Sequence, residues 1–268
     1  MDLATIIGLL LAWGSLATAL LIEGGKVSDL VNPSAFILVI GGTIGATTIA
    51  FSMKQLASVP TIVKNAFFTS EADLPQMIRI VVDFARKARK EGILALEEEC
   101  RKVENRFLQT GLQLVIDGTP SEMVREILET EIISLQERHK VGQNIFNTMG
   151  GFAPTLGIIG TVMGLVNMLG SLNQPGKMGP AIAAAFIATL YGVAFANLVF
   201  LPIGTKLKSR TSEEIIAYDM IVEGILSIQA GDNPRMVELK MMAYLPPKLR
   251  AQMTTESDRR PEPMAKAA

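Results

Sequence analysis

The sequence has little of what enzymes and metalloproteins use for chemistry. Its 268 residues include one cysteine, Cys100, and one histidine, His139. A single cysteine excludes a disulfide within the chain and a thiolate metal cluster, and a single histidine argues against a histidine-based metal site. No phosphate-binding loop and no nucleophile–base pair is recognisable. We therefore expect no enzymatic activity, no bound metal and no prosthetic cofactor.

Charge is also missing from four long stretches. No Asp, Glu, Lys or Arg occurs in residues 3–22, 30–53, 141–176 or 178–205. A helix needs about 20 mostly apolar residues to cross a bilayer, and each stretch has them. The sequence thus predicts an all-α polytopic membrane protein with four transmembrane helices. The net charge of -1 predicts no attraction to nucleic acid.

The charged residues are concentrated in the segments between and after these stretches. The sequence therefore predicts a hairpin, a helical cytoplasmic domain, a second hairpin, a cytoplasmic C-terminal helix and a disordered tail. Their predicted bounds are 1–53 (helices at about 3–22 and 33–53), 54–147, 148–205 (helices at about 148–171 and 180–203), 206–250 and 251–268.

Basic residues are distributed unevenly between the two sides of the membrane. The short loops 23–32 and 171–180 hold one each, Lys26 and Lys177, of the 25 in the chain. The others lie in the middle domain and the tail, several of them close to helix ends. Basic loops remain on the cytoplasmic side. We therefore expect a multi-pass protein of the bacterial inner membrane with both termini in the cytoplasm.

The middle domain has helical periodicity. In residues 71–92, Ile78, Val82 and Ala85 share one face, and Gly92 marks a break. The next stretch repeats this pattern through Leu96, Val103, Phe107 and Leu114, up to the turn at Asp117-Gly118.

A strong helix start follows that turn. Thr119 is a predicted N-cap, Pro120 suits the first helical position, and Glu122 completes a capping box. Because no terminator occurs before Gly150-Gly151, we predict one long helix that enters the third span.

Small residues form stripes on the third and fourth spans, and such stripes let helices approach closely. Packing between the two helices and the lining of a narrow conduit both explain this pattern. The stripes consist of Gly157, Gly160 and Gly164 on one helix and of Ala181, Ala185, Thr189, Gly192 and Ala196 on the other.

Two prolines and two threonines are the remaining candidates in these spans. Pro154 and Pro202 lie near the ends predicted to face the cytoplasm, where a proline frees a carbonyl and creates a kink or hinge. We place them at the same depth, as a candidate gate. Thr161 and Thr189 carry hydroxyls that either bond back to their own helix or offer oxygen to a cation.

No span contains a carboxylate, although an ion path through a membrane usually has an ionisable group. Either the protein moves no ions, or a partner chain supplies the acid. Glycine-striped, proline-broken helices beside a charge-rich helical domain favour the second explanation.

Several motifs in this order make the chain resemble the MotA/PomA family, the larger subunit of the bacterial flagellar stator. The resemblance extends to about residue 244. Its most specific segments are ARKARKEGILALEEE, ERHKVGQNIF, APTLGIIGTVMGLVNML, TLYGVAFANLVFLP and GILSIQAGDNPR.

The resemblance implies five copies around a dimer of a single-span MotB/PomB-type partner, which carries the missing aspartate. Ion flow would drive torque on the rotor protein FliG. By motif match, Arg89, Lys90, Glu97 and Glu98 are the rotor-contacting charges. The resemblance also assigns Pro154 and Pro202 to the channel end, and Thr161 and Thr189 to ion passage.

The transported ion stays open between sodium and proton. Both threonines favour sodium, whereas Gly151 stands where sodium-driven relatives can carry an acid. An ExbB/TolQ-type energiser, related but typically of three spans, and a non-conducting scaffold are the alternative functions.

Overall fold

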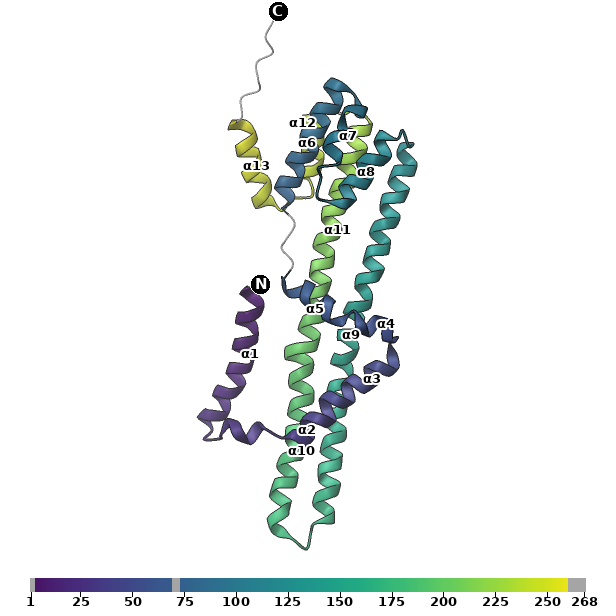
Figure 1. Cartoon of the computed structure of the whole chain (residues 1–268). Helices are drawn as coiled ribbons and strands as arrows, with labels where there is room; N and C mark the ends of the chain where they lie inside the picture. Colours follow the sequence, from purple (N-terminus) through teal and green to yellow (C-terminus); the bar gives the residue numbers. More distant parts are fainter. Residues whose placement is uncertain (1–2, 69–72, 260–268) are drawn as a thin grey trace, which may run out of the picture. The chain divides into compact units, whose positions relative to one another are not determined.

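The computed structural model describes residues 3–68 and 73–259 and contains no strand among them (Figure 1). Four helical segments are long and apolar enough to cross a membrane. They are Ala4–Ile22, Pro33–Ala50 and parts of Ser121–Gly170 and Pro175–Gln229. The predicted all-helical fold with four spans is confirmed.

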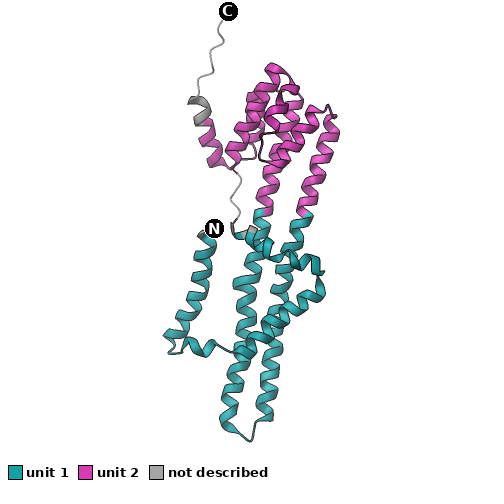
Figure 2. Cartoon of the chain, viewed as in Figure 1, with its two compact units in different colours: residues 1–70, 137–210 teal, residues 71–136, 211–268 magenta. Residues whose placement is uncertain are grey.

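The chain divides into two compact units, which Figure 2 colours separately. Unit 1 comprises residues 1–70 and 137–210, and unit 2 comprises residues 71–136 and 211–268. Unit 2 therefore combines most of the predicted cytoplasmic domain with the C-terminal segment, because the two share one hydrophobic core.

Unit 1 contains the two hairpins. The second span is a continuous sequence of short elements that begins at Pro33, where the Asn32 side chain accepts a hydrogen bond from the backbone of Ala35 (3.0 Å). Pro33 lies in the first turn, at the predicted start of this span. The elements are α1 (Leu3–Ile22), η1 (Val27–Leu30), α2 (Pro33–Phe36), η2 (Ile37–Gly41), α3 (Gly42–Ala50), α4 (Met53–Ala57), α5 (Val59–Phe68), α10 (Pro175–Phe195) and η4 (Ala196–Phe200).

Two long helices contribute to both units. α9 runs without interruption over Ser121–Gly170, which confirms the predicted long helix, although its first residue is one position later than expected. α11 (Leu201–Gln229) continues the fourth span in the same way. The fourth-span helix begins at Pro175 rather than near residue 180, so that Pro180 lies inside α10.

Unit 2 is built on a core of large aliphatic side chains. Leu112 of α8, Leu128 of α9 and Ile225 of α11 are each fully buried in it. Cys100 lies in the same core and is 1% exposed. The remaining elements are α6 (Leu74–Glu91), η3 (Ile93–Leu96), α7 (Glu97–Cys100), α8 (Arg106–Ile116), α12 (Pro234–Met242) and α13 (Pro247–Arg259).

The periodicity of α6 correctly predicted its buried face, since Ile78, Val82 and Ala85 are all buried. The pattern of the following stretch, residues 93–116, indicated a single helix, but the structure has separate elements there. It is broken between α7 and α8, where Asn105 accepts a hydrogen bond from Leu108 N and caps a new helix. A polar cap at that position competes with continuation of the preceding helix.

The C-terminal segment differs from the prediction in two ways. Residues 206–250 hold the end of α11, all of α12 and the start of α13, because Gly231 adopts a positive φ of 73° and ends the first helix. The expected disorder of 251–268 is wrong for 251–259, which belong to α13, where Met253 is buried in the core. Residues 260–268 lie outside the described residues.

Candidate functional site

The contact between α9 and α10 in unit 1 is made largely by backbone. A Cβ atom at Gly157 would lie 2.9 Å from Ala188 O, and one at Gly192 would lie 2.6 Å from Ala153 O. At Gly164 it would lie 2.5 Å from Ala185 Cβ. The predicted small-residue stripes thus pack against each other, as close helix approach requires.

Thr161 and Thr189 meet within this contact. Their hydroxyl oxygens form a hydrogen bond with each other, from facing positions on α9 and α10. Thr161 Oγ1 also lies 3.1 Å from the carbonyl oxygen of Gly157 and 3.2 Å from that of Ala185. Thr189 Oγ1 lies 3.4 Å from the same Gly157 oxygen. Both side chains are half-buried. Two hydroxyls and two carbonyls therefore converge, a set of oxygens of the kind that hard cations prefer.

The two candidate prolines lie on the same pair of helices but not at the same level. A Cβ atom at Gly150 would lie 2.5 Å from Leu201 Cδ2, so Pro202 lies near the level of Gly150. Pro154 is four residues farther along α9, about 6 Å at the usual helical rise. The prediction of equal depth is wrong by about one turn, because the two helices meet in a register that periodicity does not show.

A tyrosine hydroxyl fastens the first hairpin to α10, a role that the sequence analysis missed. Tyr191 Oη donates a hydrogen bond to the carbonyl of Leu30 and accepts one from Asn32 N–H (3.2 Å). The ring packs edge to face against Phe36 and Phe195. The only signal in the sequence was a polar aromatic residue deep in a span, which usually needs a partner there.

The four candidate charges of unit 2 lie close together in the chain at an exposed corner. Arg89 and Lys90 are exposed in the last turn of α6, and Glu97 and Glu98 are exposed at the start of α7. Glu97 pairs with Arg101 (2.7 Å). Within the described ranges, Arg89, Lys90 and Glu98 make no ion pair.

The next acid in this run behaves differently. Glu99 lies 3.4 Å from Lys87 Nζ and 3.5 Å from Lys102 Nζ. The positive charge of Lys102, followed by the hydrogen bond from Lys87, lowers the pKa of Glu99. Beside it, burial raises the pKa of the Cys100 thiol, which keeps that thiol protonated and unreactive. Glu99 is engaged within the protein, whereas Glu98 stays available to a partner.

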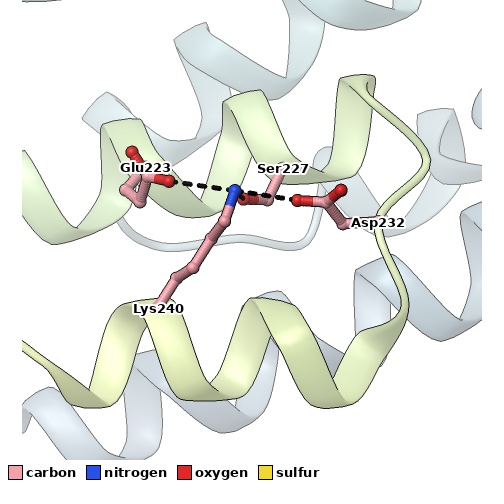
Figure 3. A network of polar contacts seen from close by, with 4 residues as sticks. All are labelled: Glu223, Ser227, Asp232 and Lys240. Carbon is pink, nitrogen blue, oxygen red and sulfur yellow. Dashed lines mark hydrogen bonds and ion pairs between the residues drawn. The ribbon is translucent and has the colours of Figure 1, made fainter.

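A second polar network, also missed, joins α11 to α12 (Figure 3). Lys240 Nζ lies 2.9 Å from Asp232 Oδ2, 3.1 Å from Ser227 Oγ and 3.2 Å from Glu223 Oε1. The hydrogen bond with Asp232 is the main reason why the pKa of Lys240 is raised and that of Asp232 is lowered. Glu223 and Ser227 are one helical turn apart, but nothing local indicated that Lys240 would face them.

Two family profiles together match most of the chain. The MotA/TolQ/ExbB proton channel family matches residues 99–220, and the motility protein A N-terminal family matches residues 6–92. The motility protein A of Bacillus subtilis is 35% identical over 96% of both chains. The chemotaxis protein PomA of Vibrio alginolyticus is 37% identical over 91% of this chain and 96% of its own.

The chain belongs to the MotA family. Solved structures agree with this assignment. The flagellar MotAB stator complex of Bacillus subtilis matches with a TM-score of 0.88, 36% identity and coverage of 92% of this chain and 98% of that one. The MotAB structure of C. jejuni gives the same TM-score at 32% identity, covering 92% of this chain and 97% of that one.

Family membership makes the protein a membrane-embedded subunit of a flagellar stator, an ion-driven torque generator and not an enzyme. It also weighs against the ExbB/TolQ-type alternative, since the relatives named above are motility proteins and the MotA-specific N-terminal profile matches as well. The roles of individual residues in this MotA-family chain remain predictions.

Proposed function

We propose that five copies of this chain surround two copies of a single-span MotB/PomB-type partner in the bacterial inner membrane. Both termini and unit 2 face the cytoplasm. Support comes from the solved relatives, which are MotAB complexes, and from the positions of Lys26 and Lys177, the only basic residues in the two short loops.

The ion path runs beside Thr161 and Thr189, and the partner supplies the acid that titrates or binds the ion. One observation supports this most strongly: two hydroxyls and two carbonyl oxygens converge at a glycine-lined contact. All four charge-free stretches lack a carboxylate, so the ionisable group of such a path has to come from another chain. Pro154 and Pro202 lie toward the end of this path that we predict to face the cytoplasm.

The oxygen-rich site favours sodium as the transported ion. A sodium ion that has lost water needs several oxygen ligands, whereas a proton passes between groups that titrate. The hydroxyl pair offers oxygens and does not titrate at physiological pH, as the sodium alternative requires. The partner's carboxylate would complete the ligand set.

Torque passes to the rotor protein FliG through Arg89, Lys90, Glu97 and Glu98. These side chains are exposed, and three of them have no ion pair in the described part of the chain. Exposed charges of both signs guide a partner and set its register more than they add affinity. Such contacts suit a surface that must engage and release repeatedly.

A complementation experiment tests the proposal. The chain is co-expressed with a MotB-type partner from the same source in cells that lack their own stator. Swimming should be restored, and its speed should rise with external sodium. An Arg89→Ala and Glu97→Ala double variant should assemble normally and produce little torque, measured as the rotation rate of tethered cells.

The outcomes separate the parts of the proposal. Stable assembly without swimming in any ionic medium would contradict the stator function. Swimming that depends on the proton gradient and ignores sodium would contradict only the choice of ion. Normal rotation of the double variant at full load would remove Arg89 and Glu97 from the rotor contact.

A further inference from the structure

Among the large hydrophobic residues that the structure describes in unit 2, Leu94 is the most exposed. It is 74% exposed, compared with 59% for Ile133, the next in that unit. A single exposed leucine is common on protein surfaces and by itself explains nothing. The position of Leu94 is what distinguishes it, since it lies between the basic pair Arg89 and Lys90 and the acidic pair Glu97 and Glu98.

The local backbone holds Leu94 outward. Gly92 ends α6 with a φ of 88°, a conformation that favours glycine. The chain then turns tightly through η3, in which Ala95 N donates to Gly92 O (3.2 Å). Leu96 at the end of this turn is fully buried in the core. The same turn therefore buries Leu96 and leaves Leu94 exposed.

This arrangement matches the anatomy of a protein interface. Stable interfaces have an apolar centre that excludes water and a polar rim that gives register. Exposed charge pairs alone contribute little affinity, because water and salt screen them. A surface that has only Arg89, Lys90, Glu97 and Glu98 would be steered to its partner but held weakly. Leu94 supplies the apolar centre that these four charges lack.

We propose that Leu94 is the anchor of the rotor contact and inserts into an apolar recess on the rotor protein. By charge complementarity, that recess is flanked by an acidic group opposite Arg89 and Lys90 and by a basic group opposite Glu97 and Glu98. The inference rests on the rotor contact proposed above and adds to it the residue that holds the surfaces together. Because the backbone on either side of Leu94 is already held in a tight turn, little backbone ordering opposes its insertion.

Binding of purified proteins tests this role. The full chain, assembled with its MotB-type partner in lipid nanodiscs, is bound to the immobilised rotor protein at low and high salt. Leu94→Ser should raise Kd by about tenfold or more, the range of an interface hot spot. Its salt dependence should stay unchanged, because the charges remain. Leu94→Met, which keeps an apolar side chain, should bind nearly as well as the parent.

Two further variants separate anchor from rim. Leu239→Ser, at an exposed leucine of α12, is the matched control and should leave Kd within about twofold. The Arg89→Ala and Glu97→Ala double variant should instead weaken the salt dependence. Equal binding by Leu94→Ser and the parent would overturn the anchor and leave the charged contact standing. Absence of binding by the parent itself would contradict the proposed rotor contact.

The assembly state is measured on the same samples by mass photometry. The proposal requires Leu94→Ser to assemble to the same mass as the parent. A smaller mass would show that Leu94 is buried between copies of the chain, and this too would overturn the proposal. In cells, Leu94→Ser should lower the stall torque while leaving ion flux through the stator intact.

Discussion

Unit 1 and unit 2 are packed in opposite ways, although α9 contributes to both. In unit 2, α9 buries Val124, Leu128 and Ile132 in a core of large aliphatic side chains. In unit 1, the same helix presents glycines to the backbone of α10. The core of unit 2 depends on large side chains that fill its volume, whereas the α9–α10 contact depends on the close approach of two backbones. Truncation should therefore damage unit 2 most, and enlargement should damage unit 1 most.

The difference follows from the surroundings that each part must work in. Exclusion of apolar side chains from water stabilises a core such as that of unit 2. Lipid tails are as apolar as leucine, so helices in a bilayer gain from close contact and shared polar groups instead. The Thr161–Thr189 hydrogen bond and the glycine contacts around it fit this second regime.

Truncation of the unit 2 core should have the largest effect. Leu112 is fully buried, and its replacement by alanine removes apolar contacts and leaves a cavity, at a cost of about 2–5 kcal/mol. We expect Leu112→Ala to lower the melting temperature of the purified chain by several degrees. Leu239→Ala, at a half-exposed site, is the control and should change it little. A similar shift for both would contradict the contrast in packing.

Enlargement at the α9–α10 contact should have the next largest effect. A Cβ atom at Gly157 would lie 2.9 Å from Ala188 O and 3.1 Å from Thr189 Cα, and backbone atoms cannot rotate away. We expect Gly157→Ala to destabilise the chain by about 1–3 kcal/mol, as overpacking does, and to reduce swimming. The readouts are the melting temperature and the swimming speed in stator-deficient cells.

Gly14 of α1 provides the matched control. A Cβ atom there would meet nothing within 4 Å, so Gly14→Ala should leave both readouts unchanged or raise stability slightly. Tolerance of alanine at Gly157 would mean that the backbone contact is not required.

The contrast also explains which features the sequence predicted well. Periodicity and helix-terminating or helix-starting residues were sufficient for features that belong to a single helix. They predicted the buried face of α6, the start of the second span at Pro33 and the continuity of α9. The predictions that failed depend on contacts with another part of the chain. The register that separates Pro154 from Pro202 depends on how two helices meet. The helical state of residues 251–259 accompanies burial of Met253 in a core formed by distant segments.

The candidate site shows the same division. Thr161 and Thr189 were chosen singly, by residue type and resemblance, and their mutual hydrogen bond became visible only in three dimensions. Tyr191 and Lys240 were missed, because their partners lie elsewhere: Leu30 precedes Tyr191 by 161 positions, and the partners of Lys240 belong to α11 and the turn after it.

Loss of one hydroxyl should have a smaller effect on stability and a specific effect on function. Thr189→Ala removes the partner of Thr161 Oγ1 and one oxygen of the proposed ion path, at a cost of about 1 kcal/mol in folding. We expect a changed dependence of swimming speed on sodium. Thr189→Ser retains the hydroxyl and should resemble the parent. Identical sodium curves for Thr189→Ala and the parent would remove Thr189 from the ion path.

The smallest effect is expected at the polar network of unit 2, because Lys240 is 40% exposed and water screens its interactions. Lys240→Met should destabilise the chain by less than about 1 kcal/mol. The effect should depend on pH, since Lys240 lowers the pKa of Asp232 from its ordinary value of 3.8. A carboxylate whose pKa is lowered by folding stabilises the fold at pH values above its pKa in the unfolded chain. This stabilisation disappears as the pH falls through its pKa in the folded protein.

The raised pKa of Lys240 acts at alkaline pH. Its contribution to the stability of the fold is present below pH 10.5, the ordinary lysine pKa, and disappears as the pH rises through the pKa of Lys240 in the folded protein. The difference in melting temperature between the parent and Lys240→Met should therefore be constant between about pH 6 and 9 and shrink below about pH 4. Lys248→Met, at an exposed lysine of α13, should show no such profile. A difference that persists undiminished at pH 3 would mean that the stem of Lys240, rather than its charge, holds α12 against α11.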